Sequence, residues 1–78
     1  MKTTAYFERR RHDHGIEYRH IEEALDGEVH RETQSDRRIR VWGFVRDFGM
    51  YVRVILLADG ETVHNAFCDR RFRPPTTP

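Results

Sequence analysis

The spacing of hydrophobic positions along this chain changes near Glu28. Before that point, apolar residues recur at the three- and four-residue intervals of amphipathic helices, and after it they alternate with polar residues as in β-strands. The pattern predicts an α+β fold in which two short N-terminal helices pack on a four-stranded antiparallel sheet. Helices this short are expected to depend on the sheet for their stability.

Both predicted helices have recognisable ends, since a capping side chain precedes the first and a glycine follows each. The first covers the segment AYFERRRHDH, in which Tyr6 and Phe7 are expected to pack. The second spans about 17–26 and has one apolar face. The residues behind these predictions are the caps Thr3 or Thr4, the glycines Gly15 and Gly27, and the apolar positions Tyr18, Ile21, Ala24 and Leu25.

Four segments with strand-like alternation follow. The polar segment EVHRETQS indicates an edge strand, and three more hydrophobic ones cover residues 38–46, 51–58 and 61–68. Asp59-Gly60 between the last two predicts a two-residue hairpin turn with positive φ, which would pair Ala58 with Glu61. Alternation from that turn places Tyr51, Arg53 and His64 on one face, and places on the core face Val52, Val54, Leu56, Val63, Asn65 and Phe67.

The strand at 38–46 can join this sheet in two ways. A four-residue DFGM loop would pair Arg46 with Tyr51, whereas a three-residue loop with Gly49 at positive φ would reverse the faces. We favour the first, because it buries the valines and exposes the arginines. It sends Ile39, Val41, Gly43 and Val45 to the core, and it leaves on the open face Arg38, Arg40, Trp42, Phe44 and Arg46.

The 78 residues are predicted to form one domain over 1–78, with a frayed tail over about 74–78. The one cysteine, Cys68, cannot form an internal disulfide, which fits a reducing cytoplasm, and we expect it to be a packed side chain. No stretch approaches the roughly 20 apolar residues of a membrane span, and the start lacks the apolar region of a secretory signal. We therefore expect a cytoplasmic protein without a membrane segment.

Charge is divided unevenly along the chain. Residues 1–36 carry a formal charge of −3 and residues 37–78 a formal charge of +4. Thirteen of the fourteen basic residues are arginines, which bind phosphate bidentately and stack on bases. A codon bias toward arginine explains this composition equally well.

The open face of the sheet combines arginines, aromatic rings and an imidazole, which suits an RNA-binding or RNA-cleaving surface. The candidate catalytic residues are Arg53, His64 and Arg40. The candidate nucleic-acid contacts are Trp42, Tyr51, Arg70 and Arg71. The alternative is a solvent-facing sheet whose arginines pair with Glu32, Glu61 and Asp69.

Other polar residues are expected to have structural or surface roles. In the terminal run, Phe72 is expected to anchor the tail, while its arginines bind phosphate or bridge to the acidic helices. The segment 12–14, His-Asp-His, has no further ligand nearby in sequence, so no metal is expected, and no cofactor motif is recognisable. His20 and His30 are expected at the surface.

The order of these segments resembles that of small RelE-like toxins, and most closely the BrnT-type and related domains. The residues that carry the resemblance are HDHGIEYRHIEEAL, ETQSDRRIRVWGFV, MYVRVILLADGETVHNAF and the terminal arginine run. Those domains have an R-x-H-G-[IV] helix, to which residues 10–16 are the nearest match. The likeness covers most of residues 6–72, although this chain lacks a recognisable C-terminal helix and has few lysines.

The resemblance implies cleavage of RNA, often mRNA on ribosomes, and neutralisation by an antitoxin protein from the same operon. Carried onto this chain, it points to Arg40, Arg53, His64, Arg70 and Arg71. Two other functions stay open: a non-catalytic module that binds nucleic acid or protein through the same face, and a homodimer with Trp42 and Phe44 in its interface.

Overall fold

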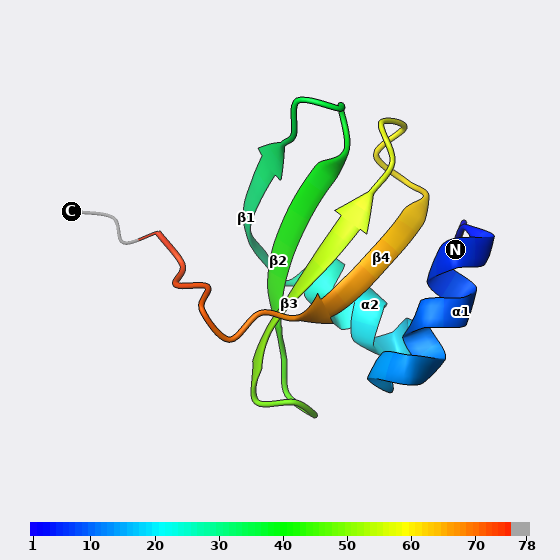
Figure 1. Cartoon of the computed structure of the whole chain (residues 1–78). Helices are drawn as coiled ribbons and strands as arrows, with labels where there is room; N and C mark the ends of the chain where they lie inside the picture. Colours follow the sequence, from blue (N-terminus) through cyan, green and yellow to red (C-terminus); the bar gives the residue numbers. More distant parts are fainter. Residues whose placement is uncertain (76–78) are drawn as a thin grey trace.

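The computed structural model describes residues 1–75, which form two helices followed by a four-stranded antiparallel sheet (Figure 1). This is the α+β arrangement predicted from the hydrophobic pattern. The helices are α1 (Ala5–His14) and α2 (Tyr18–Asp26), and the strands are β1 (Glu28–Thr33), β2 (Ile39–Val45), β3 (Met50–Leu56) and β4 (Val63–Cys68). The tail expected to fray over 74–78 falls partly on residues 76–78, which lie outside the described residues.

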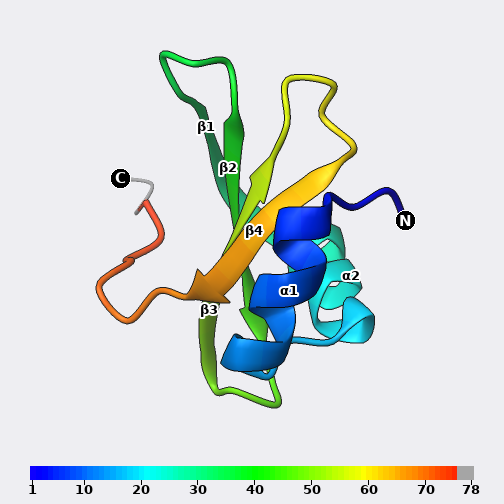
Figure 2. The same cartoon turned by 45° about the vertical axis from the view of Figure 1, so that its right-hand side comes forward.

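The strands follow chain order, β1-β2-β3-β4, and polar β1 lies at an edge as predicted. Both helices lie on one face of the sheet, α1 along β4 and α2 across β2 and β3 (Figure 2). The chain after β4 leaves on the opposite side. We call the helix-covered side the inner face and the other side the outer face. Within residues 1–75, neither helix is long and apolar enough to cross a membrane.

Helix α1 begins and ends where the sequence predicts. Thr4 Oγ1 accepts a hydrogen bond from Phe7 N at 3.1 Å, and Gly15 ends the helix in the left-handed conformation, with φ 66°. The segment before the helix runs beside β4, because Thr4 N donates to Val63 O and Val63 N donates to Lys2 O. These bonds tie the N-terminus and α1 to the edge of the sheet.

Helix α2 is joined to the β2–β3 turn through His20. Glu17 N donates to His20 Nδ1 at 3.0 Å, and His20 Nε2 lies 2.9 Å from Asp47 Oδ2. The ring also contacts that of Phe48, at 4.4 Å between centroids. His20 is only 3% exposed, so its predicted surface position is wrong. The ring can be buried because both of its nitrogens have hydrogen-bond partners.

The core lies between the helices and the inner face of the sheet. Gly43 stands among the buried valines of β2 and β3 because the backbone of α2 passes directly over it, and a Cβ there would lie 1.9 Å from Ala24 O. A glycine therefore sets how closely α2 approaches the sheet. The core residues are Phe7, Ile16, Ile21, Ala24, Val41, Val45, Val52, Val54, Leu56, Val63 and Ala66.

The favoured faces of β2 are confirmed, but its pairing with β3 is shifted. Val45 pairs with Met50, instead of the predicted pairing of Arg46 with Tyr51. The shift is one residue on each strand, so every side chain keeps its predicted face. The loop is the four residues 46–49 rather than DFGM, because Gly49 adopts the left-handed conformation (φ 64°) that closes the turn.

The tip of the β3–β4 hairpin is wider than predicted. Leu57 N donates to Thr62 O at 2.9 Å across a loop of residues 58–61, so the predicted two-residue turn is not formed. Gly60 has a positive φ of 72°, but Asp59 does not, which excludes the predicted turn type. The Asp59 carboxylate instead accepts hydrogen bonds from the Thr62 hydroxyl and from two backbone N–H groups, and these lower the pKa of Asp59 to about 2.

A bulge in β4 changes the faces of its C-terminal half. Ile55, the predicted partner of His64, pairs with Asn65, so that His64 is an extra residue in the strand. Beyond it, Ala66 is buried at 2% exposure. Asn65 and Phe67 line the outer face, and their predicted core positions are wrong. The bulge keeps the Asn65 amide out of the core, where an unpaired polar group would be costly.

Candidate nucleic-acid interface

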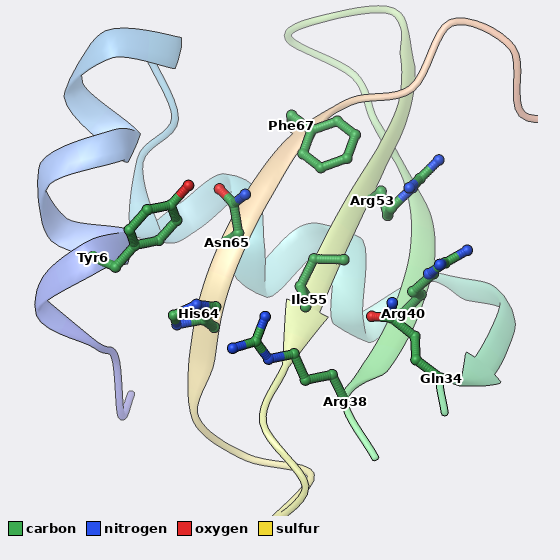
Figure 3. A pocket seen from close by; sticks show the side chains of 9 residues that line it. All are labelled: Tyr6, Gln34, Arg38, Arg40, Arg53, Ile55, His64, Asn65 and Phe67. Carbon is green, nitrogen blue, oxygen red and sulfur yellow. The ribbon is translucent and has the colours of Figure 1, made fainter. Parts of the chain in front are cut away.

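The β4 bulge, the β1–β2 turn and α1 border an open hollow of about 450 Å³ on the outer face of the sheet (Figure 3). Its size is in the range of ordinary ligand sites. We call it the arginine hollow. Its lining residues are Tyr6 from α1, Gln34 and Arg38 beside the β1–β2 turn, Arg40 from β2, Arg53 and Ile55 from β3, and His64, Asn65 and Phe67 from β4.

The charges around the arginine hollow are one-sided. Three of its nine lining residues are arginines and none is acidic. Arg38 Nε lies 3.8 Å from Oδ2 of Asp36, which belongs to the same β1–β2 turn. Glu32, the cross-strand neighbour of Arg40, bonds to His30 at 2.9 Å, and no ion pair of Arg40 is found among the described residues. An anion entering the hollow therefore meets a positive potential.

His64 is oriented by the N-terminal region. Thr4 Oγ1 lies 3.1 Å from His64 Nδ1, and the Tyr6 ring stacks on the imidazole at 4.9 Å between centroids. Burial, and then the charge of Arg38, lower the pKa of His64 below its ordinary value of 6.5, so the ring is mainly neutral at pH 7. Arg38 extends across the face toward it (Figure 3). The Thr4 hydroxyl can donate to Nδ1 or accept from it, so either tautomer satisfies this bond.

Arg53 is held by a carboxylate beside the hollow. Its Nε and one terminal nitrogen donate to Asp69 Oδ2 at 3.1 and 2.8 Å, and Trp42 Nε1 donates to the same oxygen at 2.9 Å. The guanidinium also lies over the Phe67 ring, 4.9 Å from its centroid. Burial raises the pKa of Asp69, but the hydrogen bonds from Trp42 and Arg53 outweigh burial, and its net pKa is lowered.

The alternative in which acids neutralise the sheet arginines holds for one of the three predicted acids. Asp69 pairs with Arg53, whereas Glu61 bonds to Lys2 and Glu32 bonds to His30. Of the arginines in the hollow, Arg40 has no ion pair among residues 1–75, and Arg38 has only its 3.8 Å contact with Asp36.

The aromatic residues of the outer face form a separate cluster. Trp42 is only 4% exposed, because Phe72 stacks on it with centroids 4.9 Å apart and planes at 10°. Phe72 thus anchors the tail as predicted, and Tyr51 meets it edge-on at 5.2 Å. The open position predicted for Trp42 is therefore wrong, because Phe72 covers its ring. Phe44, by contrast, is 43% exposed.

Arg70 and Arg71 are exposed in the turn that follows β4. Among residues 1–75, neither pairs with an acid of α1 or α2, so the predicted bridge to the acidic helices is not observed. Arg71 instead lines a second hollow beside Phe72.

The remaining candidate chemistry is dispersed. His12, Asp13 and His14 are exposed on α1, and no group of three or more histidine, cysteine or acidic side chains converges within the described part of the chain. Cys68 packs partly against the core, and burial raises the pKa of its thiol, which disfavours the reactive thiolate.

Several lining residues of the arginine hollow were not among the predicted site residues. Arg38 was placed on this face by the alternation of β2, and its position in the same strand as Arg40 was a usable signal. Tyr6 and Gln34 come from distant segments, and no local pattern marks them. Asn65 and Phe67 reach the hollow only through the bulge.

No family model matches this chain, and the searches of curated proteins and of solved structures returned no match either.

Proposed function

We propose that the arginine hollow binds RNA and that the chain is a toxin-like protein of a toxin–antitoxin pair. The observation that carries the proposal is the set of three arginines around a hollow without an acidic lining residue. Arginine forks bind phosphate, and unstacked bases stack on aromatic rings and guanidinium planes, both of which line the hollow at Phe67 and Arg53. The RelE-like resemblance adds mRNA on the ribosome, an antitoxin partner and the cytoplasm to this proposal.

In the catalytic form of the proposal, the chain is an endoribonuclease. The RNA 2′-hydroxyl gives up its proton and attacks the adjacent phosphorus, and the bond to the 5′-oxygen breaks as that oxygen takes a proton from solvent. Neutral His64 can accept the first proton at Nε2 when its Nδ1–H donates to Thr4. Arg38 and Arg40 then stabilise the charge that develops on the phosphate oxygens.

The second candidate is a non-catalytic module that binds nucleic acid through the same face. Two features favour it: Arg53 is already paired with Asp69, and His64 is the only histidine or acidic side chain in the lining of the hollow. Such a site holds a phosphate, and besides His64 the one lining group that can transfer a proton is the Tyr6 hydroxyl.

Binding and cleavage of a labelled single-stranded RNA distinguish these functions. We expect binding that weakens steeply with salt, and Arg40→Ala to weaken it and to reduce the salt slope by about 1. The matched control is Arg46→Ala, because Arg46 carries the same charge on a side chain that is 89% exposed in the β2–β3 turn. His64→Ala is expected to abolish cleavage while retaining most of the binding.

Equal RNA affinities for Arg40→Ala and Arg46→Ala would show that the arginine hollow is not the RNA-binding site. Cleavage that persists in His64→Ala would remove His64 as the proton acceptor. Binding without any cleavage by the unmodified chain would favour the non-catalytic module. A homodimer through Phe44 is a separate proposal, and a molar mass independent of protein concentration would contradict it.

A further inference from the structure

Arg53 lies between two hollows of the outer face. One is the arginine hollow, and the other, of about 360 Å³, lies toward the C-terminal tail. We call the second one the tail hollow, and its lining includes Trp42, Arg53, Asp69, Arg71, Phe72 and Arg73. Arg53 lines both hollows, so an RNA strand bound in one can continue into the other along the outer face of the sheet.

In this subsection the tail means residues 69–75, which follow β4. Two of its residues occupy Arg53 and Trp42, the groups that lie where the two hollows meet. The Asp69 carboxylate takes the donors of Arg53 and Trp42, and the Phe72 ring covers Trp42 face to face. As a result, Asp69 has a side chain only 10% exposed, and Arg53 one that is 27% exposed. The cation and the ring that could bind a nucleotide are both present, and both are covered by the chain's own residues.

Arg53 and Trp42 make the two kinds of contact by which proteins bind a nucleotide: hydrogen bonds to an anionic oxygen and stacking on a ring. An arginine fork binds carboxylate and phosphate oxygens in the same way. A ring stacked at 4.9 Å and 10° on tryptophan takes the place that a base takes on an aromatic platform. Asp69 therefore occupies the position of a phosphate, and Phe72 the position of a base.

We propose that the tail hollow is a second nucleotide subsite, closed in the free protein by Asp69 and Phe72. When single-stranded RNA extends from the arginine hollow, a phosphate replaces Asp69 on Arg53 and a base replaces Phe72 on Trp42. This inference rests on the proposed RNA binding, and it adds a regulatory contact to it. The tail competes with RNA, so its release sets part of the binding affinity.

The tail is attached in a way that permits this exchange. Asp69 N donates to Tyr51 O at 2.9 Å, so the main chain stays paired with β3 while the Asp69 side chain turns away. Phe72 lies beyond the last strand and is held by ring contacts to Trp42, Tyr51 and His30. Releasing Phe72 therefore breaks no strand pairing. Once Asp69 has turned away, three arginines of this hollow outnumber its other acid, Glu32, and attract phosphate.

Trp42 is the only tryptophan in the chain, so its fluorescence reports on the subsite. We would titrate the full chain with a single-stranded RNA of about ten nucleotides, which is long enough to cross both hollows. Binding is followed by anisotropy of the labelled RNA and, in the same titration, by Trp42 emission. We expect Trp42 emission to fall as the protein becomes saturated with RNA, because a stacked nucleobase quenches indole fluorescence.

Two variants test the competition. Asp69→Asn keeps the size of the side chain and weakens its hold on Arg53 by removing the negative charge, and we expect about fivefold tighter RNA binding. Glu61→Gln is the matched control, because it removes the same charge at the far end of β4 and is expected to change the affinity less than about twofold. Phe72→Ala leaves all charges in place, and it is expected to expose Trp42 in the free protein and also to tighten binding.

RNA binding with unchanged Trp42 emission would overturn the second subsite and leave the proposed function in place. So would equal affinities of Asp69→Asn and Glu61→Gln together with no tightening in Phe72→Ala. Absence of RNA binding in both the unmodified chain and Asp69→Asn would overturn the proposed function and this inference together. Binding by Asp69→Asn alone would support the inference, because it identifies the tail as the block.

Discussion

Gly43 of β2 and Ala24 of α2 meet backbone to backbone, with no room for a side chain between them. A Cβ on Gly43 would lie 1.9 Å from Ala24 O and less than 3 Å from two other Ala24 backbone atoms. Backbone atoms cannot turn aside as the end of a side chain can. This contact therefore fixes the distance between α2 and the sheet.

Gly43→Ala is expected to destabilise the fold by about 2 kcal/mol or more, because α2 must shift away from the core to admit a methyl group. Urea unfolding followed by circular dichroism measures the free energy of unfolding. Gly27→Ala is the control, since Gly27 has an ordinary φ of −101° and its Cβ would lie 3.3 Å from Glu23 O. Equal losses in the two variants would contradict the close approach.

His20→Ala is expected to cost about 1–3 kcal/mol of stability, since it removes a buried ring together with its bonds to Glu17 N and Asp47. The same substitution at His12, which is exposed on α1, is expected to have little effect. Thermal unfolding of both variants at one pH makes the comparison. A His20 variant as stable as the His12 variant would show that the joint between α2 and the β2–β3 turn is dispensable.

Glu8 is expected to contribute to stability in a pH-dependent way. Hydrogen bonds from Thr3, Tyr18 and Arg11 lower its pKa to about 2. Because the folded state favours the ionised form, this stabilisation is complete above the ordinary value of 4.5 and is lost as the pH falls toward 2. The melting temperatures of the unmodified chain and Glu8→Gln should differ at pH 7 and converge near pH 2.

Glu22→Gln provides the control for that experiment, because Glu22 is exposed on α2. Its melting temperature should follow that of the unmodified chain across the whole pH range. A constant difference between Glu8→Gln and the unmodified chain at every pH would mean that the ionised carboxylate of Glu8 is not what stabilises the N-terminal region.

RNA binding is expected to tighten as the pH falls from about 7 to about 5.5. Burial and the charge of Arg38 lower the pKa of His64, so the free protein has a neutral ring, whereas a bound phosphate favours the charged ring. Binding therefore takes up a proton, and affinity rises on acidification. His64→Gln should abolish this pH dependence and His12→Gln should retain it. The same slope in all three proteins would exclude His64 from contact with the phosphate.

Local signals in the sequence were sufficient for the elements of the fold. The ends of α1 at Thr4 and Gly15 were predicted correctly, because capping depends on neighbouring residues. The alternation of β2 and β3 assigned valines and arginines to opposite faces. The shifted loop at Gly49 did not disturb that assignment, because moving each strand by one residue preserves the faces. The turn type predicted for the hairpin at Asp59 was wrong, but Leu56 and Val63 pair as predicted.

The candidate site was only partly predictable, and the bulge explains why. Simple alternation along β4 buries Asn65 and Phe67, whereas the folded chain inserts His64 as an extra residue and buries Ala66 instead. That choice depends on the cost of burying an amide and on the space that the helices leave. Neither is visible in the period of one strand.

The sequence by itself therefore determined two capped helices, four strands and an outer face that carries Arg40, Arg53 and His64, because capping and alternation act between close neighbours. The tertiary structure alone decided which of these groups are accessible. It brought Thr4 and Tyr6 to His64, about sixty residues away in the chain. It also placed Asp69 on Arg53 and Phe72 on Trp42, because hydrogen bonds and ring contacts across the sheet form only once the strands are paired.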